Sequence, residues 1–345
     1  MKRTAGPDCG DQSECMAGKA LVIGAQGVLG SFIAEGLSGA GWEVIRAGRR
    51  PEAATDFRHL DLADPKSVSN GIRAFDLVVS TAHEPDLALE RTILDQGGTL
   101  IDLIELSEME RAQLDEVANP KGLVVTDTGL GGVAYLAVAE LLDAHPEADS
   151  AEYALMVSAS GSTGRAGGLF AHKLLTSSRH HQTAKVPFPE PFGTRRGLEV
   201  GQGTNGVPRT AVNGVPIRHY LCMLPSPLNG MLLALNSARL ISALPKASFT
   251  AGARRVPDEL SEERICEWVA VKTDGERIAA QTVEGEGYYR MTTAATVVFA
   301  AALIGRREKG IHAIEELLSL SELRAALGKQ GVSVRKLAMS DGRDG

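Results

Sequence analysis

The chain has 345 residues, enough for about two domains. Its composition, 43% hydrophobic and 23% charged, is ordinary for a soluble globular protein. Lys and Arg number 36 against 43 Asp and Glu, and a net charge of −7 argues against a general nucleic-acid-binding protein, which needs a dominant basic face. Aromatic residues make up only 4% of the chain, so we expect an aliphatic core.

The four cysteines, Cys9, Cys15, Cys222 and Cys266, are too few and too scattered for a disulfide framework or a zinc motif. We therefore expect a reduced, cytoplasmic setting. Residues 1–18 are polar, lack the apolar run of a secretory signal and are interpreted as a disordered leader. The most apolar stretch, residues 291–305, is shorter than the ~20 residues of a membrane span, so it predicts a buried helix.

From residue 19 to about 145, short apolar runs alternate with segments of helical periodicity. The runs are residues 20–24, 42–47, 57–62, 76–80, 98–103 and 123–127, and the helical segments are Val28–Ser38, Pro65–Ala74, Asp86–Asp95 and Glu108–Ala118. Continuous apolar strands separated by helices are typical of a parallel sheet buried on both faces. The fold class predicted is α/β, with a Rossmann doubly wound parallel sheet in residues 19–145.

The residue pattern changes after residue 145, and residues 146–288 predict a second, α+β domain with a mixed or antiparallel sheet. We expect strands at Glu152–Ala159 and Ile217–Met223, helices at Gly168–Ser177 and Met231–Ser242, loops and short strands over 182–216, and a hairpin of Glu267–Thr273 and Arg277–Val283 around Asp274-Gly275. Residues 289–325 predict two C-terminal helices, Tyr289–Ile304 and Ile311–Leu318. Residues 326–345 are interpreted as a loosely ended tail.

The sharpest motif is the run from Ala20 to Gly30, in which an apolar strand meets three glycines spaced three apart and then a helix. The first glycine permits a sharp turn, the second lets the backbone approach a pyrophosphate, and the third allows close helix packing. The helix start presents free N–H groups to phosphates. We place a dinucleotide on Gly24, Gln26, Gly27, Val28 and Leu29. The alternative is a tight turn without a ligand.

The second strand ends in Arg46-Ala-Gly-Arg49-Arg50, without the acid that usually binds the ribose 2′-hydroxyl of NAD. Arg49 and Arg50 offer permanently charged forks to a 2′-phosphate, so NADP(H) is preferred, with NAD(H) as the alternative cofactor. The other interpretation is two solvated surface arginines.

Other strand ends supply further candidates. Asp61, after the third strand, is interpreted either as an adenine neighbour or as a helix N-terminal acid before Pro65. Thr81 and Ala82 end the fourth strand, where we expect the nicotinamide ribose, since ligands of such sheets bind at carboxyl ends of strands. His83 either donates a proton or lines the site.

Five sequence segments, in this order along the chain, resemble segments of the saccharopine dehydrogenase-like (saccharopine reductase-like) family. They are residues 24–30, 75–82, 98–103, 126–132 and 289–294. The resemblance implies an NAD(P)-dependent oxidoreductase in which residues 146–288 form the substrate and dimerisation domain and residues 289–325 return to the Rossmann domain. Asp102 stands at the family's Asp position, where it either orients ligands or holds a loop, and Gly129 lies near the expected nicotinamide. The family often has Pro-Gly where this chain has Gly131-Gly132.

The second half carries weaker candidates. The glycine-rich loop of residues 161–168 is interpreted as a segment that closes over a ligand or as an ordinary surface loop. Lys173 either binds a carboxylate or protonates an amine, or is solvated. Arginines 195, 196, 209 and 218 are candidates for receiving an anionic substrate. The pair His180-His181 lacks partners at metal-ligand spacing, so no metal is expected.

The function that this sequence favours is an NADP(H)-dependent oxidoreductase acting on a small or medium polar carbonyl, imine or activated alkene, in one cleft between the domains. His83, Asp102 and Lys173 are the catalytic candidates. The alternative is a non-catalytic NADP(H) sensor or scaffold, because no catalytic pair of the short-chain dehydrogenases stands in the sequence. The expected partners are a small-molecule substrate and a second copy of the chain, without nucleic acid or a membrane span.

Overall fold

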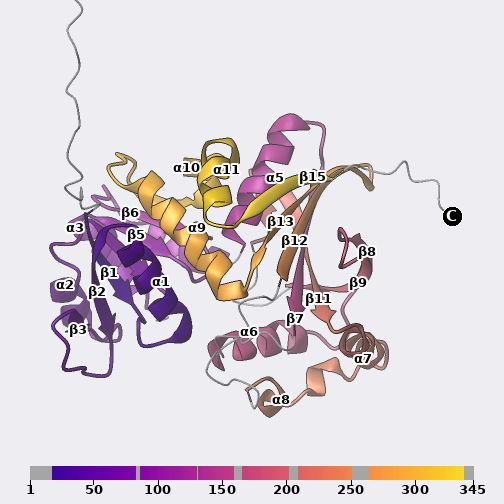
Figure 1. Ribbon diagram of the computed structural model, residues 1–345, viewed down its shortest axis with the longest axis horizontal. Helices are drawn as coiled ribbons and strands as arrows, with labels where there is room; N and C mark the ends of the chain where they lie inside the picture. Colours follow the sequence, from indigo (N-terminus) through magenta and orange to yellow (C-terminus); the bar gives the residue numbers. More distant parts are fainter. Residues whose placement is uncertain are drawn as a thin grey trace, which may run out of the picture.

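The computed structural model describes residues 18–82, 86–129, 131–158, 165–201, 209–250 and 264–337. These residues build two sheets with helices packed between and around them (Figure 1). Within them, no helix is both long and apolar enough to cross a membrane.

Sheet A is a parallel sheet of seven strands in the described chain, in the order β14-β6-β5-β4-β1-β2-β3. Its strands are β1 (Gly18–Ile23), β2 (Trp42–Gly48), β3 (Phe57–His59), β4 (Leu77–Ser80), β5 (Thr99–Asp102), β6 (Leu123–Thr126) and β14 (Gly310–Ala313). All of its strand pairs are parallel. Strands 3-2-1-4-5-6 follow the order of a doubly wound dinucleotide-binding fold, which confirms the predicted fold class.

Helices cover both faces of sheet A because its central strands are apolar on both sides: every residue of β4 and β6 is buried. The helices of this half are α1 (Val28–Gly39), α2 (Pro65–Gly71), α3 (Ala88–Gln96), α4 (Glu108–Asp115) and α5 (Gly132–Ala144). One core joins Leu21, Val78 and Val124 to Val68 of α2 and Ile93 of α3. The opposite face contributes to a second core, which extends into the other half of the molecule.

Sheet B is a mixed sheet in the order β15-β13-β12-β7-β11-β9-β8, with β10 paired to β11. Its strands are β7 (Ser150–Ser158), β8 (Thr183–Pro187), β9 (Thr194–Val200), β10 (Ala211–Val212), β11 (Val215–Leu224), β12 (Arg264–Thr273), β13 (Glu276–Glu286) and β15 (Ser333–Leu337). Only β7 and β11 run parallel among the described pairs. Asp274 and Gly275 both have positive φ (54° and 82°) in the β12–β13 turn, as the predicted hairpin requires.

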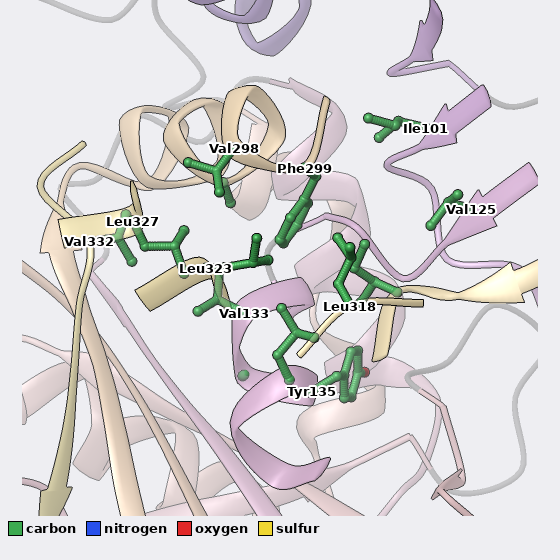
Figure 2. Packing of buried hydrophobic residues seen from close by; sticks show 14 of the residues in the cluster. Ile101, Val125, Val133, Tyr135, Val298, Phe299, Leu318, Leu323, Leu327 and Val332 are labelled. Carbon is green, nitrogen blue, oxygen red and sulfur yellow. The ribbon is translucent and has the colours of Figure 1, made fainter. Parts of the chain in front are cut away.

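The remaining helices are α6 (Arg165–Thr176), α7 (Ser226–Ser237), the 3-10 turn η1 (Ile241–Ala243), α8 (Lys246–Thr250), α9 (Tyr288–Leu303), α10 (Ile314–Leu317) and α11 (Leu320–Lys329). Helix α9 lies between the two sheets and packs along α1, while α6, α7 and α8 lie at one end of sheet B (Figure 1). Figure 2 shows the shared core: Val298 and Phe299 of α9 meet Val133 and Tyr135 of α5 beside Leu323. One continuous core therefore ties the halves together.

Two C-terminal predictions are wrong. The expected helix Ile311–Leu318 is instead β14 followed by the single turn α10, because Ile311 pairs with Val124 at the edge of sheet A. The expected tail from residue 326 contains the end of α11 and strand β15, in which Val334 pairs with Val283 of β13. Both strands are short and stand at sheet edges, where the local pattern of apolar residues carries little information on pairing.

Candidate functional site

Each of the three glycines after β1 is required for a different physical reason. Gly24 has φ +80°, which L side chains rarely adopt. A Cβ on Gly30 would lie 2.8 Å from Ala25 Cα and inside the Gly24 backbone, so the helix could not pack here with any other residue. A Cβ on exposed Gly27 would meet only the Gly24 carbonyl oxygen, at 3.2 Å. The backbone conformation at Gly24 and the helix packing at Gly30 therefore explain two of the glycines. At Gly27 neither applies, and the absence of a Cβ leaves the backbone open to a ligand.

Helix α1 starts at this turn without a capping side chain and without an acidic residue in its first turn. The Gly27 N–H donates to the Gly24 carbonyl at 2.8 Å, whereas Val28 and Leu29 present backbone N–H groups that no capping side chain satisfies. The positive end of the helix dipole favours an anion there. The structure brings together the turn residues named from the sequence in one cradle of backbone donors.

The side chain of Gln26 ties this cradle to the end of β2. Its Nε2 donates to the Arg50 carbonyl at 3.0 Å, and its Oε1 accepts from the Arg50 N–H at 3.3 Å. Gly48 makes room for the amide, since a Cβ there would lie 2.7 Å from Gln26 Oε1. The backbone that carries Arg49 and Arg50 is therefore fixed beside the glycine turn.

The arginines at this edge fall into two groups. Arg46 is held by Glu52 at 2.8 Å and Asp56 at 3.0 Å, and these hydrogen bonds raise the pKa of Arg46 and lower that of Asp56. Arg49 and Arg50 are exposed, and neither side chain has a hydrogen bond or ion pair with the rest of the described chain. Two permanent cations are thus available beside the cradle, while the acids of the following loop are occupied.

The other strand-end candidates have structural partners. The Asp61 carboxylate accepts the Ala63 N–H at 3.2 Å within the turn after β3, while Asp64 caps α2. The Thr81 hydroxyl donates to the Ile23 carbonyl at 3.1 Å and lies against Gly24, so Thr81 and Ala82 stand at the switch between β1 and β4. His83 lies outside the described residues.

Asp102 ends β5, and only 1% of it is exposed. Burial and the neighbouring Glu90 carboxylate raise the pKa of Asp102 well above its ordinary value. Its Oδ1 accepts the Ile104 N–H at 3.0 Å, and a side-chain hydrogen bond with Glu90 adds to the raised pKa. The Thr128 hydroxyl donates to the Asp102 carbonyl at 2.6 Å, and a Cβ on Gly129 would lie 2.7 Å from the Leu103 carbonyl oxygen. Asp102 and Gly129 therefore lie together at the carboxyl ends of β5 and β6.

Lys173 stands apart from these groups. It lies on α6 with an exposed side chain, and the neighbouring His172 contacts the Leu244 carbonyl at 2.9 Å. Throughout the described chain, no hydrogen bond or ion pair joins Lys173 to a strand-end candidate of sheet A. Residues 161–164, the first half of the glycine-rich loop, lie outside the described residues, and residues 165–168 belong to α6.

A buried polar cluster that sequence reasoning missed lies where the two sheets meet. Tyr135, at the start of α5, approaches His219 Nε2 of β11 with its hydroxyl at 3.3 Å. Tyr153 of β7 donates its hydroxyl to Glu267 Oε1 of β12 at 3.0 Å. The Tyr153 ring packs edge-on against His219, with centroids 5.4 Å apart. Four side chains from four elements thus form one continuous buried group.

Burial sets the protonation of this cluster. It raises the pKa of Glu267 to about 8, despite the opposing hydrogen bond from Tyr153, and lowers the pKa of His219 to about 3. Burial and Asp127 raise the pKa of Glu105, in the loop after β5, to about 7. Near neutral pH His219 is therefore neutral, and Glu267 carries its proton more often than not.

Of the four arginines proposed to receive an anionic substrate, Arg209 is engaged in ion pairs, Arg195 and Arg218 face away from His219, and Arg196 is exposed on β9. Arg209 forms ion pairs with Asp127 and Glu315, and Arg111 also pairs with Asp127. Arg218 alternates with His219 along β11, so it lies on the opposite face of sheet B. Arg195 likewise shares a face with Gly197, whose Cβ position points at Cys222 of that opposite face.

Sequence reasoning missed the cluster because each member comes from a different element. Glu267 carried a usable signal: it is an acid inside the apolar strand Arg264–Thr273 and takes an inward position. In the described chain, no group of three or more His, Cys, Asp or Glu side chains could hold a metal ion.

A profile of the NAD dependent epimerase/dehydratase family matches residues 20–93, which contain the glycine turn and the strands that follow it. Curated protein sequences gave no significant match. Among solved structures, apo saccharopine dehydrogenase (L-Glu forming) from Saccharomyces cerevisiae covers 93% of this chain and 100% of its own, at 12% identity and a TM-score of 0.52. The two chains share one fold.

Dipicolinate-bound dihydrodipicolinate reductase from Paenisporosarcina sp. TG-14 is also similar, at 12% identity and a TM-score of 0.42, covering 87% of this chain and 99% of its own. The resemblance drawn from the sequence motifs is thus confirmed for the fold, over nearly the whole chain.

Proposed function

We propose that this chain is an NADP(H)-dependent oxidoreductase of the saccharopine dehydrogenase-like type. Its reaction would be hydride transfer to or from a small or medium polar carbonyl, imine or activated alkene. The fold shared with saccharopine dehydrogenase and the family match at residues 20–93 support the class of activity.

The observation that carries the proposal is the link between the glycine turn and Arg50. Gln26 holds the Arg50 backbone through two hydrogen bonds, beside a turn whose Gly27 is left open by the packing of the chain. A dinucleotide pyrophosphate fits the N–H groups of the turn and of the α1 start, and a 2′-phosphate fits the free guanidinium groups of Arg49 and Arg50. Asp61, Thr81 and Ala82 would line the adenine and ribose parts of the same site.

The bound nicotinamide would supply or accept the hydride, which is the chemistry of that cofactor. The protein then needs to orient the substrate, exclude water and move a proton. The carboxyl ends of β4, β5 and β6 carry Ala82, Asp102 and Gly129, and ligands of open parallel sheets bind outside such ends. His83, Asp102 and Lys173 remain the catalytic candidates taken from the sequence.

Binding and turnover can be separated experimentally. Calorimetry with NADPH and NADH measures the cofactor site, and loss of NADPH absorbance over a panel of carbonyls, imines and activated alkenes measures the reaction. We expect saturable NADPH binding, weaker NADH binding and turnover of at least one compound. Binding with no turnover of any compound would favour the non-catalytic sensor, and absence of binding would refute both.

Three finer proposals accompany this function. Residues 19–145 would bind the cofactor and residues 146–288 the substrate. The protein would form a homodimer through this second domain and would reside in the cytoplasm. Sedimentation velocity at micromolar concentration tests the dimer, and fractionation of the source cells tests the location.

A further inference from the structure

Glu267 is a buried carboxyl group with one oxygen that the protein does not satisfy. No part of Glu267 is exposed, and Oε1 accepts the Tyr153 hydroxyl at 3.0 Å, whereas Oε2 has no hydrogen-bond partner among the described residues. Its neighbours across the sheet, Leu155 of β7 and Val283 of β13, are apolar. A buried carboxyl oxygen without a partner is costly, so the group is positioned for something that the chain alone does not supply.

The face of sheet B that carries Glu267 is the face turned toward sheet A. Tyr153 pairs with His219 on one side and with Val269 on the other, and Glu267 stands two residues before Val269 on the same face. Val269 belongs to the core that also contains Tyr135 of α5, Phe299 of α9 and Val125 of sheet A. Glu267 therefore lies on the face of sheet B that packs against α5, α9 and sheet A.

The surroundings of Glu267 are rich in acidic and phenolic groups. Tyr153, Tyr135 and His219 come from β7, α5 and β11, and Tyr288 and Glu105 come from α9 and the loop after β5. Burial raises the pKa of Tyr288, and the charges of Glu267 and Glu105 raise it further. Glu105 Oε2 is a second buried oxygen without a partner in the described chain. The nearby cations, Arg111 and Arg209, are paired with Asp127 and Glu315.

We propose that Glu267 is the proton donor of the oxidoreductase, that Oε2 donates to the oxygen of an uncharged carbonyl substrate, and that the Tyr135–Tyr153–His219–Glu267 cluster forms the substrate wall. The proposal rests on the proposed NADP(H) function and names its substrate class. Because Tyr153 donates to Oε1, the proton of the neutral acid sits on Oε2, the buried oxygen that has no hydrogen-bond partner among the described residues. A substrate carboxylate would meet acids there rather than a free cation.

The carbonyl carbon accepts the hydride, the two π electrons of the C=O bond move to oxygen, and the Oε2–H bond breaks as the proton joins that oxygen. The product is an alcohol, the cofactor leaves oxidised, and Glu267 becomes a carboxylate that Tyr153 stabilises through Oε1. Solvent then returns the proton. An iminium substrate would need no such acid, since its nitrogen is already protonated, so the geometry favours a carbonyl oxygen.

The first test needs no substrate. Infrared difference spectra of the full chain loaded with NADP⁺ report protonated carboxyl groups, and Glu267→Gln removes the band that belongs to Glu267. We expect this band at pH 6.5 and its loss as the pH rises through about 8. Glu284→Gln is the matched control, because Glu284 of the neighbouring strand β13 is also a buried carboxyl but faces the other way, where it pairs with Arg264 at 2.9 Å.

The second test measures NADPH oxidation with matched ketones. We would pair 2-pentanone with 4-oxopentanoate, and cyclohexanone with 4-oxocyclohexanecarboxylate, and add 2-cyclohexenone. We expect each uncharged ketone to exceed its carboxylate partner at least about tenfold in kcat/KM. Glu267→Gln should lower kcat on the order of 100-fold or more with the Kd for NADPH unchanged, while Glu284→Gln behaves as the wild type.

Each outcome decides the proposal. An ionised Glu267 at pH 6.5, preference for the carboxylates, no turnover of any uncharged ketone, or full turnover by Glu267→Gln would overturn it. If the wild-type protein did not bind NADPH, the proposed cofactor function would be refuted instead. Calorimetry on the same samples distinguishes a failure of the cofactor function from a failure of the Glu267 proposal.

Discussion

The Gln26 side chain makes both of its amide hydrogen bonds to the backbone of one residue, Arg50, at 3.0 and 3.3 Å. The glycine turn and the end of β2 are therefore held in a fixed relation, although 24 positions separate the two residues. In the proposed complex the turn contacts the pyrophosphate and the β2 end contacts the 2′-phosphate. The amide of Gln26 thus determines the spacing between the two anion sites.

Replacing Gln26 with Ala should weaken NADPH binding about five- to tenfold, because an intramolecular hydrogen bond contributes on the order of 1 kcal/mol. NADH affinity should change less, since NADH has no 2′-phosphate to be positioned. Calorimetry measures both affinities. Gln96→Ala is a suitable control, because Gln96 also makes a surface hydrogen bond, to Ser69 at 2.7 Å, but lies between α3 and α2. Equal losses for both cofactors would contradict the spacing role.

Gly27 and Gly30 should respond differently to substitution. Gly27→Val is expected to fold with little change in Tm, since the new Cβ meets only the Gly24 carbonyl at 3.2 Å, but to lose most of its NADPH affinity. Gly30→Ala should be destabilised by at least about 1–3 kcal/mol, because its Cβ would overlap backbone atoms. Thermal unfolding and calorimetry measure the two effects. A folded Gly27→Val protein that binds NADPH normally would remove the pyrophosphate site.

Glu267 makes the folded protein less stable as the pH rises. Its pKa is about 8 in the folded protein and near 4.5 when unfolded, so the folded state binds the extra proton between these values. The stabilisation that this extra proton gives to the folded state is complete below about pH 4.5 and is lost as the pH rises toward 8. Each pKa unit corresponds to roughly 1.4 kcal/mol. Relative to wild type, Glu267→Gln should therefore become more stable by a few kcal/mol between pH 5 and pH 8, as urea unfolding would measure. Parallel pH profiles for the two proteins would contradict a neutral buried acid.

The catalytic candidates from the sequence can be tested one at a time with a turned-over substrate. We expect His83→Ala, Asp102→Asn or Lys173→Ala, in at least one case, to lower kcat without changing the Kd for NADPH. Asn is chosen at Asp102 because its side-chain oxygen can still accept the Ile104 N–H. Full turnover by all three variants would exclude these residues while leaving the cofactor site intact.

The sequence predicted the features whose causes are local. The glycine spacing, the alternation of apolar strands with helices and the Asp274-Gly275 hairpin each lie within a short stretch of chain, and each appears in the structure. Strand β14 and strand β15 were missed because their pairing partners, β6 and β13, lie far away in sequence. The Tyr135–Tyr153–His219–Glu267 cluster was missed for the same reason, since its contacts span 84 and 114 positions.

The central claim is that the free guanidinium groups of Arg49 and Arg50 bind the 2′-phosphate of NADP(H). The most direct measurement is calorimetric titration of the wild type and of the Arg49→Glu, Arg50→Ala double variant with NADPH and with NADH. A charge-assisted contact contributes roughly 1.5–3 kcal/mol, so the double variant should bind NADPH about ten- to a hundredfold more weakly while NADH binding changes little. Arg73→Glu, at another exposed arginine of the same half, controls for the change in net charge. Equal losses for NADPH and NADH, or none for NADPH, would contradict the claim.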